Sequence, residues 1–237
     1  MSLDRAFDSP ESKRTHNRAL FSTIADRYDL ITALLSYGQD ARWKAKLIAM
    51  AAVQPGERAL DLASGTGDIA FAVAARGARV TALDLTHRML QLAQQRGGAA
   101  SVHFINGDMC ELPVASVSFH LVTTGYGLRN VPDLNRAIDE IARVLKPGGR
   151  LLSLDFNRPE NPIVRGVYLT YLTVIGSTLG WVLHRDPDTY RYIPASIERY
   201  PGARGVADRL AARGFEHVEV MPLLFGLMTL HFATRSR

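Results

Sequence analysis

An arginine and an asparagine follow an apolar, strand-like run near the middle of the chain. Residues 121–130 read L-V-T-T-G-Y-G-L-R-N, so the run ends in two glycines, Tyr126, Arg129 and Asn130. A guanidinium carries a permanent positive charge and several donors, and the carboxamide adds another donor. Such groups stabilise negative charge that develops on an oxygen atom during a reaction. The pair is therefore a candidate catalytic site, and a turn with a surface salt bridge is the competing interpretation.

A glycine-rich loop is the second candidate. Residues 60–70 read L-D-L-A-S-G-T-G-D-I-A, in which Gly65-x-Gly67-x-x-Ala70 matches the dinucleotide-binding fingerprint. Asp84 stands 17 residues after Gly67, near the place of a ribose-binding acid. The glycine spacing by itself therefore allows a nicotinamide-dependent oxidoreductase.

Asp61 favours a different ligand. It stands four residues before Gly65, where its carboxylate would repel a pyrophosphate placed over the loop. S-adenosylmethionine instead offers an ammonium for Asp61 and a carboxylate for the backbone N–H groups of the loop. Asp84 would then accept from both ribose hydroxyls, and Asp108 from the adenine amino group. The three acids would line the carboxyl edge of one sheet. The simpler alternative makes them helix-capping and turn residues.

Strands and helices alternate through most of the chain, as in parallel βαβ units. The expected strands cover residues 58–63, 78–84, 102–106, 118–124 and 150–156. Helices are expected at about 67–76, after a Thr86 N-cap, at about 133–145 and near 206–213. The last two strands, at 216–221 and 226–233, have a link so short that it requires an antiparallel hairpin. The sheet is therefore expected to be mostly parallel, with one reversed strand.

Two apolar segments lie outside this alternation. Apolar residues at helical spacing predict one helix over about 21–35, and a second helix follows over about 43–50. Residues 158–200 carry more apolar helical sequence, of which 166–183 approaches the ~20 residues that span a membrane. Glycines and hydroxyl residues interrupt this stretch, so a buried or interface-lying helix is favoured over a spanning one.

Composition excludes several classes of protein. With 47% hydrophobic and 22% charged residues among 237, the chain resembles an ordinary folded domain. The net charge of +5 is scattered, without the basic run of a nucleic-acid-binding arm, so no nucleic-acid partner is expected. Cys110 is the only cysteine, and the polar N-terminus lacks the core of a signal peptide, so cytoplasmic localisation is expected. The seven dispersed histidines lack metal-ligand spacing, and no metal site is expected.

Several segments carry a resemblance to a known family. They are Y-D-L-I-T-A-L-L-S-Y-G-Q-D-A-R-W-K (28–44), L-D-L-A-S-G-T-G-D (60–68), Y-G-L-R-N-V-P-D (126–133), R-V-L-K-P-G-G-R-L-L (143–152), D-T-Y-R-Y-I-P-A-S-I-E-R-Y-P (188–201) and T-L-H (229–231). With them the sequence resembles the ubiquinone/menaquinone biosynthesis C-methyltransferases, a branch of the class I S-adenosylmethionine-dependent methyltransferases.

The resemblance implies an α/β, Rossmann-like class I fold. Its sheet would have seven strands, mostly parallel with one antiparallel strand, with N-terminal helices and a helical insertion after strand five. One domain would cover residues 1–237. Within it, residues 1–54 would form a helical lid, and residues 158–200 an apolar insertion that contacts substrate or membrane.

The implied reaction is methylation of a ring carbon on a reduced polyprenyl quinone. The acceptor would be demethylmenaquinol, the benzoquinol precursor of ubiquinol, or both. The hydroquinone form is needed because its ring is electron-rich, and loss of a hydroxyl proton enriches it further. A phenolic pKa is roughly 10, so the site must accept the proton or stabilise the oxyanion.

The resemblance also implies roles for individual residues. Arg129 and Asn130 would form the catalytic centre with an ordered water as proton acceptor, and Tyr28 would lie close by. Arginine stays protonated, so Arg129 is interpreted as the organiser of oxyanion and water, with Asp155 and His231 as other candidates for the base. The implied cofactor contacts are Asp61, Ala63, Gly65, Thr66, Gly67, Asp84, Leu85, Asp108, Met109 and Gly125. The implied substrate contacts are Tyr126, Asp155, Tyr190, Tyr192 and His231.

The chain departs from the family pattern at three places. Family members usually have Gly-Gly-Thr-Gly where Ser64 to Gly67 stand, often serine at Gly125, and usually glutamate at Asp155. None of these changes removes a charge that the chemistry needs. Gly125 loses one hydroxyl contact to the cofactor.

Alternative functions remain open from the sequence. One is an S-adenosylmethionine-dependent methyltransferase for another small or lipid acceptor, and another is a cofactor-binding subunit without activity. The apolar insertion would line the channel of the polyprenyl tail or dock peripherally on the inner face of a membrane, or it would fill core or a homodimer interface.

Overall fold

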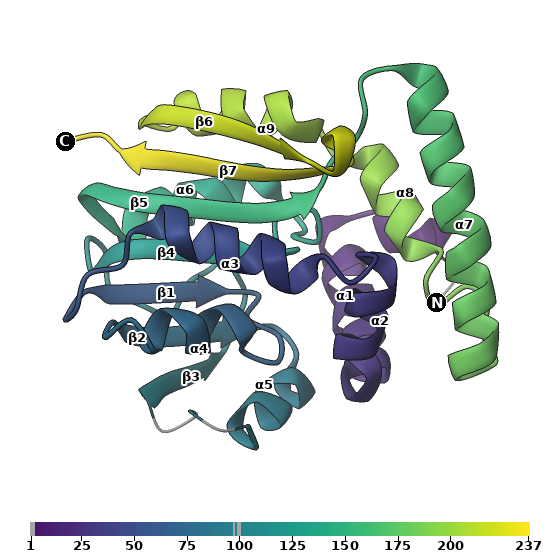
Figure 1. Cartoon of the computed structure of the whole chain (residues 1–237), viewed down its shortest axis with the longest axis horizontal. Helices are drawn as coiled ribbons and strands as arrows, with labels where there is room; N and C mark the ends of the chain where they lie inside the picture. Colours follow the sequence, from purple (N-terminus) through teal and green to yellow (C-terminus); the bar gives the residue numbers. More distant parts are fainter. Residues whose placement is uncertain (1–2, 97, 99–100) are drawn as a thin grey trace.

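The strands expected from the sequence form one seven-stranded sheet (Figure 1). A computed structural model describes residues 3–96, 98 and 101–237. The strands are β1 (Arg58–Leu62), β2 (Arg79–Asp84), β3 (Val102–Asn106), β4 (Phe119–Gly125), β5 (Leu145–Phe156), β6 (Phe215–Leu223) and β7 (Met228–Arg235). Their order is β3-β2-β1-β4-β5-β7-β6, and β7 runs antiparallel to both β5 and β6. The predicted mostly parallel sheet with one reversed strand is confirmed.

Helices cover both faces of this sheet. The helices α3 (Asp40–Ala51) and α4 (Asp68–Ala74) pack on one face, and α6 (Leu134–Val144) and α9 (Gly202–Ala211) pack on the other. Successive side chains of β1 alternate between the faces, so Ala59 joins the first layer while Leu60 and Leu62 join the second. A strand buried on both sides in this way reads as a continuous apolar run. The helix α5 (His87–Gln94) contacts β2 and β3.

The N-terminal segment lies at the carboxyl ends of the strands (Figure 1). It contains η1 (Asp4–Phe7), α1 (Pro10–Ile24), η2 (Ala25–Arg27) and α2 (Tyr28–Leu35). The prediction of one helix over 21–35 is wrong, because the 3-10 turn η2 separates α1 from α2. Ile24 of α1 and Ile31 of α2 pack in one cluster with Tyr190.

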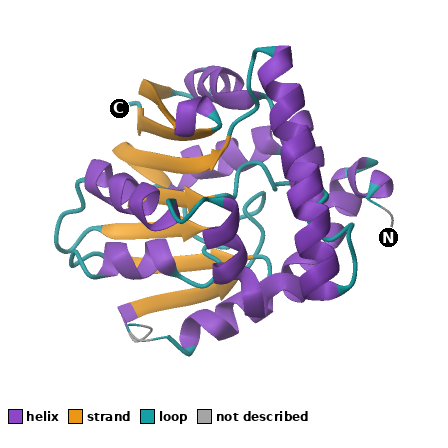
Figure 2. Cartoon of the chain, turned by 45° about the vertical axis from the view of Figure 1, so that its right-hand side comes forward, coloured by secondary structure: helices purple, strands orange, loops and turns teal. Residues whose placement is uncertain are grey.

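The insertion after β5 forms two helices, α7 (Pro162–His184) and α8 (Tyr192–Arg199). In Figure 2 the long helix α7 stands beyond the carboxyl ends of the strands, apart from the sheet. It is long and apolar enough to cross a membrane by length and composition, and 22% of its most apolar 18-residue window is buried. Most of the helix is therefore exposed, and it contributes to the core mainly through the buried side chains of Tyr168 and Leu172.

Two local features differ from the expected ones. β5 begins at Leu145 rather than at 150, because the K-P-G-G segment continues the strand with a register shift against β4. Thr86 occupies the N-cap position of α5, but its side chain makes no cap hydrogen bond. Its backbone N–H instead donates to Oδ1 of Asp84.

Candidate active site

Three cavities meet at the carboxyl edge of the sheet, and Tyr28 and Tyr126 line all three. The central cavity, of about 650 Å³ with its open mouth, follows the glycine loop and the ends of β2, β3 and β4. The apolar cavity, of about 610 Å³, lies between α1, α2, α3 and α8. The Asp61 cavity, of about 310 Å³, lies under the glycine loop beside Asp61 and Lys44.

The glycine loop connects β1 to α4 through positive backbone φ angles. Ala63 has φ +50°, Gly65 +54° and Gly67 +92°. A Cβ at Gly67 would lie 2.6 Å from the ring of Phe71, so both conformation and space require glycine there. Ala63 adopts the left-handed region despite its methyl group, at a cost of roughly 1–2 kcal/mol.

Asp84 holds the loop from the end of β2. Its Oδ2 accepts from the backbone N–H of Gly65 at 2.8 Å, and its Oδ1 accepts from that of Thr86 at 2.7 Å. Burial raises the pKa of Asp84, although both backbone donors act in the opposite direction. Each carboxylate oxygen accepts more than one hydrogen bond, so Asp84 keeps capacity for ligand hydroxyls in the central cavity that it lines.

Asp61 is buried with one oxygen open. Its Oδ1 accepts from the hydroxyl of Thr123 at 2.7 Å, while its Oδ2 has no partner among the described residues. Burial raises the pKa of Asp61 to about 7, although the Thr123 hydrogen bond and the charge of Lys44 oppose the shift. An open oxygen on a buried carboxyl suits a cationic donor.

Lys44 brings a cation into the same cavity. Its Nζ lies 2.6 Å from Oδ2 of Asp40 and 2.8 Å from Oδ2 of Asp68. Burial opposes the charge of Lys44, but the two carboxylates outweigh burial and hold its pKa above the usual value. The Asp61 cavity therefore offers an acceptor for an ammonium and a donor for a carboxylate, as an α-amino acid requires.

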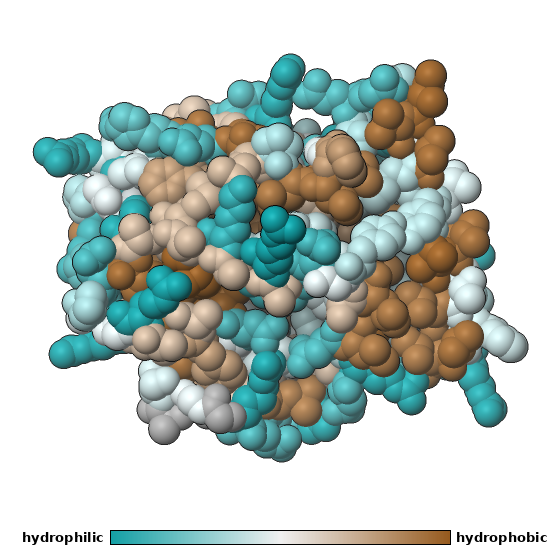
Figure 3. All heavy atoms as spheres, in the orientation of Figure 1, coloured by the Kyte–Doolittle hydropathy of each residue, from teal (hydrophilic) through white to brown (hydrophobic). Residues whose placement is uncertain are grey.

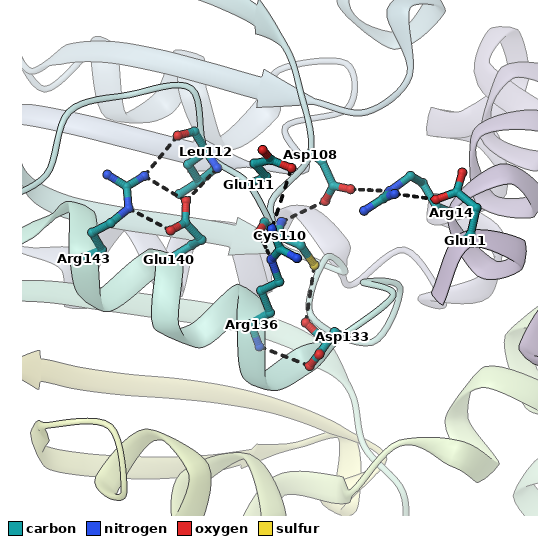
Figure 4. A network of polar contacts seen from close by, with 10 residues as sticks. All are labelled: Glu11, Arg14, Asp108, Cys110, Glu111, Leu112, Asp133, Arg136, Glu140 and Arg143. Carbon is teal, nitrogen blue, oxygen red and sulfur yellow. Dashed lines mark hydrogen bonds and ion pairs between the residues drawn. The ribbon is translucent and has the colours of Figure 1, made fainter. Parts of the chain in front are cut away.

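Asp108 lies at the far end of the central cavity, where α1 already contacts it (Figure 4). Its Oδ2 accepts from Nε of Arg14 at 2.6 Å, and its Oδ1 accepts from the backbone N–H of Cys110 at 2.8 Å. Arg14 also binds Glu11 one turn earlier in α1. The predicted adenine contact therefore shares its carboxylate with the N-terminal segment.

The other predicted cofactor residues lie around the same space. Leu85, Met109 and Gly125 line the central cavity. Thr66 lines the Asp61 cavity, and its hydroxyl donates to Oδ1 of Asp29 at 2.8 Å.

Arg129 is buried beside Asp155. The two residues are 5% and 1% exposed, and Nε of Arg129 lies 3.3 Å from Oδ1 of Asp155. The backbone N–H of Arg129 donates to Oδ2 of Asp155 at 3.0 Å, and Nη1 donates to the hydroxyl of Ser196. The guanidinium lies 5.1 Å from the ring centroid of Phe156. This arrangement is a buried ion pair, not the surface salt bridge of the competing interpretation.

Asp155 lines none of the three cavities, whereas Arg129 lines the apolar cavity. Burial raises the pKa of Asp155, opposed by the charge of Arg129 and by backbone donors. The structure therefore gives Asp155 the position of a residue that orients Arg129, which differs from the predicted contact with substrate.

His231 also differs from its predicted position. It is 1% exposed within β7, and its Nε2 donates to the backbone carbonyl of Ala203 at 3.0 Å. Burial lowers its pKa. His231 lines none of the three cavities, because β7 is sandwiched between β5 and β6 away from the ligand edge.

The tyrosines form the boundary between the cavities. Tyr126 has φ +60°, and its hydroxyl donates to Oδ1 of Asp40 at 2.6 Å. Its carbonyl accepts from Nδ2 of Asn130 at 2.7 Å. Burial raises the pKa of Tyr28 to about 12, which keeps this hydroxyl protonated at neutral pH. Tyr190 and Tyr192 of the D-T-Y-R-Y segment line the apolar cavity.

Sequence reasoning missed three residues of this site: Asn17, Lys44 and Ser196. Lys44 lies in the A-R-W-K segment of the resemblance, one turn after Asp40, and its spacing from that acid is the signal that points to it. Asn17 lies in α1, whose start is marked by Ser9 and Pro10. Ser196 lies in the segment 188–201 of the resemblance, but its residue type and spacing do not point to Arg129.

Comparison with known proteins identifies the family of the chain. The model of the ubiE/COQ5 methyltransferase family matches residues 9–235. A ubiquinone/menaquinone biosynthesis C-methyltransferase of Rubrivivax gelatinosus is 40% identical over 219 residues, which cover 92% of this chain and 86% of that protein. A demethylmenaquinone methyltransferase of Thermobifida fusca is 40% identical over 226 residues, which cover 92% and 94%.

A solved structure shares the fold at lower identity. An S-adenosylmethionine-dependent methyltransferase of Thermotoga maritima superposes with a TM-score of 0.66 at 17% identity, covering 92% of this chain and 99% of that one. The fold is therefore that of class I methyltransferases. On the family match and the close relatives, this chain belongs to the ubiE/COQ5 methyltransferase family.

Proposed function

We propose that this methyltransferase methylates a ring carbon of a reduced polyprenyl quinone. The observation that carries the proposal is the buried Arg129–Asp155 pair beside an apolar cavity that shares Tyr28, Tyr126 and Asn130 with the central cavity. Relatives named for quinone methylation support the same class of acceptor. A methyl donor in the central cavity and a ring in the apolar cavity would meet at these shared residues.

The methyl donor implied by the family is S-adenosylmethionine, which supplies a methyl group on a positively charged sulfur. The residues present fit it: the open Oδ2 of Asp61 suits the ammonium, and Lys44 suits the carboxylate. Asp84 suits the ribose hydroxyls and Asp108 the adenine amino group, each in the wall of the central cavity. We therefore add Lys44 to the cofactor-binding residues predicted from the sequence.

The acceptor ring gains nucleophilic character when its hydroxyl loses a proton. Arg129 would stabilise the resulting oxyanion by its fixed charge, a contribution on the order of 3–4 kcal/mol per donor. Asp155 and Ser196 would hold the guanidinium in place. Tyr28 would stay protonated and help position the ring, while a water beside Arg129 and Asn130 would take the proton and pass it to bulk solvent.

The polyprenyl tail explains the apolar surface around the site. Residues 1–54 act as a lid over the cavities, because α1 contributes Asn17 and Phe21 and α2 contributes Tyr28 to their walls. The insertion at 158–200 places α7 beside the apolar cavity, with Leu179 and Leu183 packed in the cluster of Ile31 and Tyr190. We propose that the exposed face of α7 rests on the inner membrane surface, where the tail resides, so the enzyme works as a cytoplasmic peripheral protein.

Binding and turnover test the proposal together. Wild-type protein should bind S-adenosylhomocysteine and methylate a short-tail demethylmenaquinol analogue under reducing conditions. The same assay with a benzoquinol and with a lipid amine separates the acceptor classes. Turnover confined to the amine would replace the quinol by another acceptor, and binding without turnover on any of the three would indicate a subunit without activity.

A further inference from the structure

Three polar groups at the boundary between the central and apolar cavities are buried without a hydrogen-bond partner in the described part of the chain. They are Oδ1 of Asn17, Oδ1 of Asn130 and the hydroxyl of Tyr192. Asn17 lines the central cavity, Tyr192 lines the apolar cavity, and Asn130 lines both. Buried polar groups are nearly always paired, so three open ones at one boundary indicate a polar ligand.

The two amides are fixed in orientation. Nδ2 of Asn17 donates to the backbone carbonyl of Asn130 at 2.5 Å, and Nδ2 of Asn130 donates to that of Tyr126 at 2.7 Å. Rotating either amide by 180° would place its oxygen against a carbonyl oxygen, which cannot donate. Both Oδ1 atoms are therefore left as acceptors that need a donor.

Tyr192 lies close to these amides and to Arg129. Burial raises the pKa of the Tyr192 hydroxyl to about 12, while the charge of Arg129 and the amide of Asn17 oppose the shift. Tyr192 is 2% exposed and Asn17 3% exposed. A protonated phenol can donate as well as accept, so the boundary offers two acceptors and one group of either kind.

The chemistry of the boundary selects its ligand. Two acceptor oxygens exclude a carboxylate or phosphate, which would be repelled. An ammonium would satisfy the acceptors but would face the buried guanidinium of Arg129. A neutral hydroxyl offers a donor and carries no positive charge that Arg129 would repel. It donates to an amide oxygen and accepts from Tyr192.

We propose that Asn17, with Asn130 and Tyr192, binds one hydroxyl of the acceptor ring and thereby selects the reduced form of the quinone. The inference rests on the proposed function, since it takes the acceptor to be a hydroquinone. A hydroquinone has two hydroxyls: one donates its single hydrogen to Oδ1 of Asn17, beside Oδ1 of Asn130, and accepts from Tyr192, while Arg129 faces the other as it loses its proton. An oxidised quinone carries carbonyl oxygens instead. A carbonyl oxygen cannot donate a hydrogen bond, so it would face the amide oxygens unpaired and be repelled by them.

Asn17 comes from the lid helix α1, so the hydroxyl site exists only when α1 lies over the cavities. The bond from Asn17 to the Asn130 carbonyl connects the lid directly to the loop that carries Arg129. Asn17 therefore places a substrate-binding side chain on α1. From this position its amide oxygen distinguishes a ring hydroxyl from a ring carbonyl.

Binding of the two redox forms tests the inference. The probe is a short-tail 2-prenyl-1,4-naphthohydroquinone and its quinone, each titrated anaerobically into protein saturated with S-adenosylhomocysteine, so that no turnover occurs. Wild-type protein should bind the hydroquinone about tenfold more tightly than the quinone, as expected for one hydrogen bond lost and one acceptor left unpaired.

Two variants separate recognition from lid structure. Asn17→Leu and Asn17→Asp both lose the donor to the Asn130 carbonyl, but only Asn17→Leu loses the acceptor. Asn17→Leu should lose most of the preference for the hydroquinone, with Oδ1 of Asn130 still in place, and Asn17→Asp should keep it. Ser22→Ala, on an exposed position of the same helix, should change neither affinity, and S-adenosylhomocysteine should bind all of them within about twofold.

Each outcome has a distinct meaning. An equal loss of preference in both Asn17 variants would overturn the inference and make Asn17 a structural residue. A loss of S-adenosylhomocysteine affinity in Asn17→Leu with an unchanged preference would place the amide on the cofactor instead. Wild-type protein that binds S-adenosylhomocysteine but neither form of the ring would overturn the proposed function and this inference with it.

Discussion

At the scale of single residues, some charged side chains lie in ion pairs and others keep an atom without a hydrogen-bond partner. An ion pair holds a side chain in one orientation, whereas an atom without a partner has capacity left for binding. Arg129 is neutralised by Asp155 and oriented by Ser196, all within the protein interior. Asp61 keeps an open oxygen, with no partner among the described residues. The ion pair fixes the orientation of Arg129, whereas the open oxygen of Asp61 keeps its full capacity to accept a hydrogen bond.

Arg129→Ala should act on stability as well as on rate. It leaves Asp155 buried without its partner, and removing one member of a buried pair costs about 3–5 kcal/mol. Urea unfolding should show this loss, and the double variant Arg129→Met/Asp155→Leu should recover most of it. Turnover on the quinol should fall at least about a hundredfold in both, with S-adenosylhomocysteine affinity nearly unchanged. A near-normal rate in either variant would remove Arg129 from the catalytic residues.

Cofactor affinity should depend on pH through Asp61. Because burial raises its pKa to about 7, the carboxyl is largely protonated below that pH and cannot accept from an ammonium. The affinity for S-adenosylhomocysteine should therefore fall as pH drops below 7, by up to about tenfold per unit, and recover above it. Calorimetry in buffers of different ionisation enthalpy should also show proton release on binding near pH 7. Asp61→Asn should bind weakly and lose both effects; proton release that persists in this variant would assign the titration to another group.

Lys44→Met should discriminate between two ligands. If Lys44 binds the amino-acid carboxylate, the variant should lose at least about tenfold in affinity for S-adenosylhomocysteine. Its affinity for 5′-methylthioadenosine, which lacks the amino-acid end, should stay the same. Lys46→Met provides the matched control, since Lys46 is exposed on the same helix. Equal losses for both ligands in Lys44→Met would mean that the lysine supports the fold of the cavity.

Helix α1 connects the elements of the site to one another. It binds Asp108 through Arg14, the Asn130 carbonyl through Asn17 and the Arg129 carbonyl through Lys13. These contacts hold α1 against the end of the central cavity, to whose wall it contributes Asn17 and Phe21. Polar contacts that are partly exposed are each weak, which suits an element that opens and closes.

Arg14→Ala should loosen this element. Removing the ion pair with Asp108 should raise the hydrogen-exchange rate of the α1 amides in the ligand-free protein and increase the association rate of S-adenosylhomocysteine. Arg18→Ala, an exposed position of the same helix, serves as the control. Unchanged exchange in Arg14→Ala would show that α1 is held by its apolar contacts alone.

The whole molecule has one side that differs from the rest. Figure 3 shows apolar surface gathered where α2 and α7 lie. The exposed apolar residues there are Leu30, Leu34 and Tyr37 near α2, and Ile163, Val164, Val167, Val174, Trp181 and Val182 in α7. Monomeric proteins rarely expose a contiguous patch of this kind without a partner, and an interfacial helix rests on a bilayer by such a face.

Trp181→Glu should weaken membrane binding without affecting the chemistry. Trp181 is 67% exposed, and a charge at this position opposes burial in the headgroup region. Co-sedimentation with anionic vesicles should fall by about tenfold or more, while turnover on a soluble short-tail quinol stays the same. Val117→Glu, which adds the same charge to another exposed apolar position, should bind vesicles normally. Loss of a dimer instead of vesicle binding would assign this face to a second copy of the chain.

The sequence by itself determined the elements and the ligand edge. The alternation of strands and helices and the short link before β7 specify a parallel sheet with one reversed strand, because chain length limits each connection. Asp61 and Asp84 lie near the ends of β1 and β2, and Asp108 lies just after β3, so their gathering at one edge follows from local pattern alone.

Only the tertiary structure decided which of the candidate side chains line the cavities. Asp155 and His231 have the right chemical type, but packing places one against Arg129 and the other inside the sheet. Asn17 and Lys44 come from helices outside the alternating core, and their contacts span long stretches of sequence. Periodicity records which residues are buried, whereas a hydrogen bond between distant elements depends on how the helices pack, and that has no local signature.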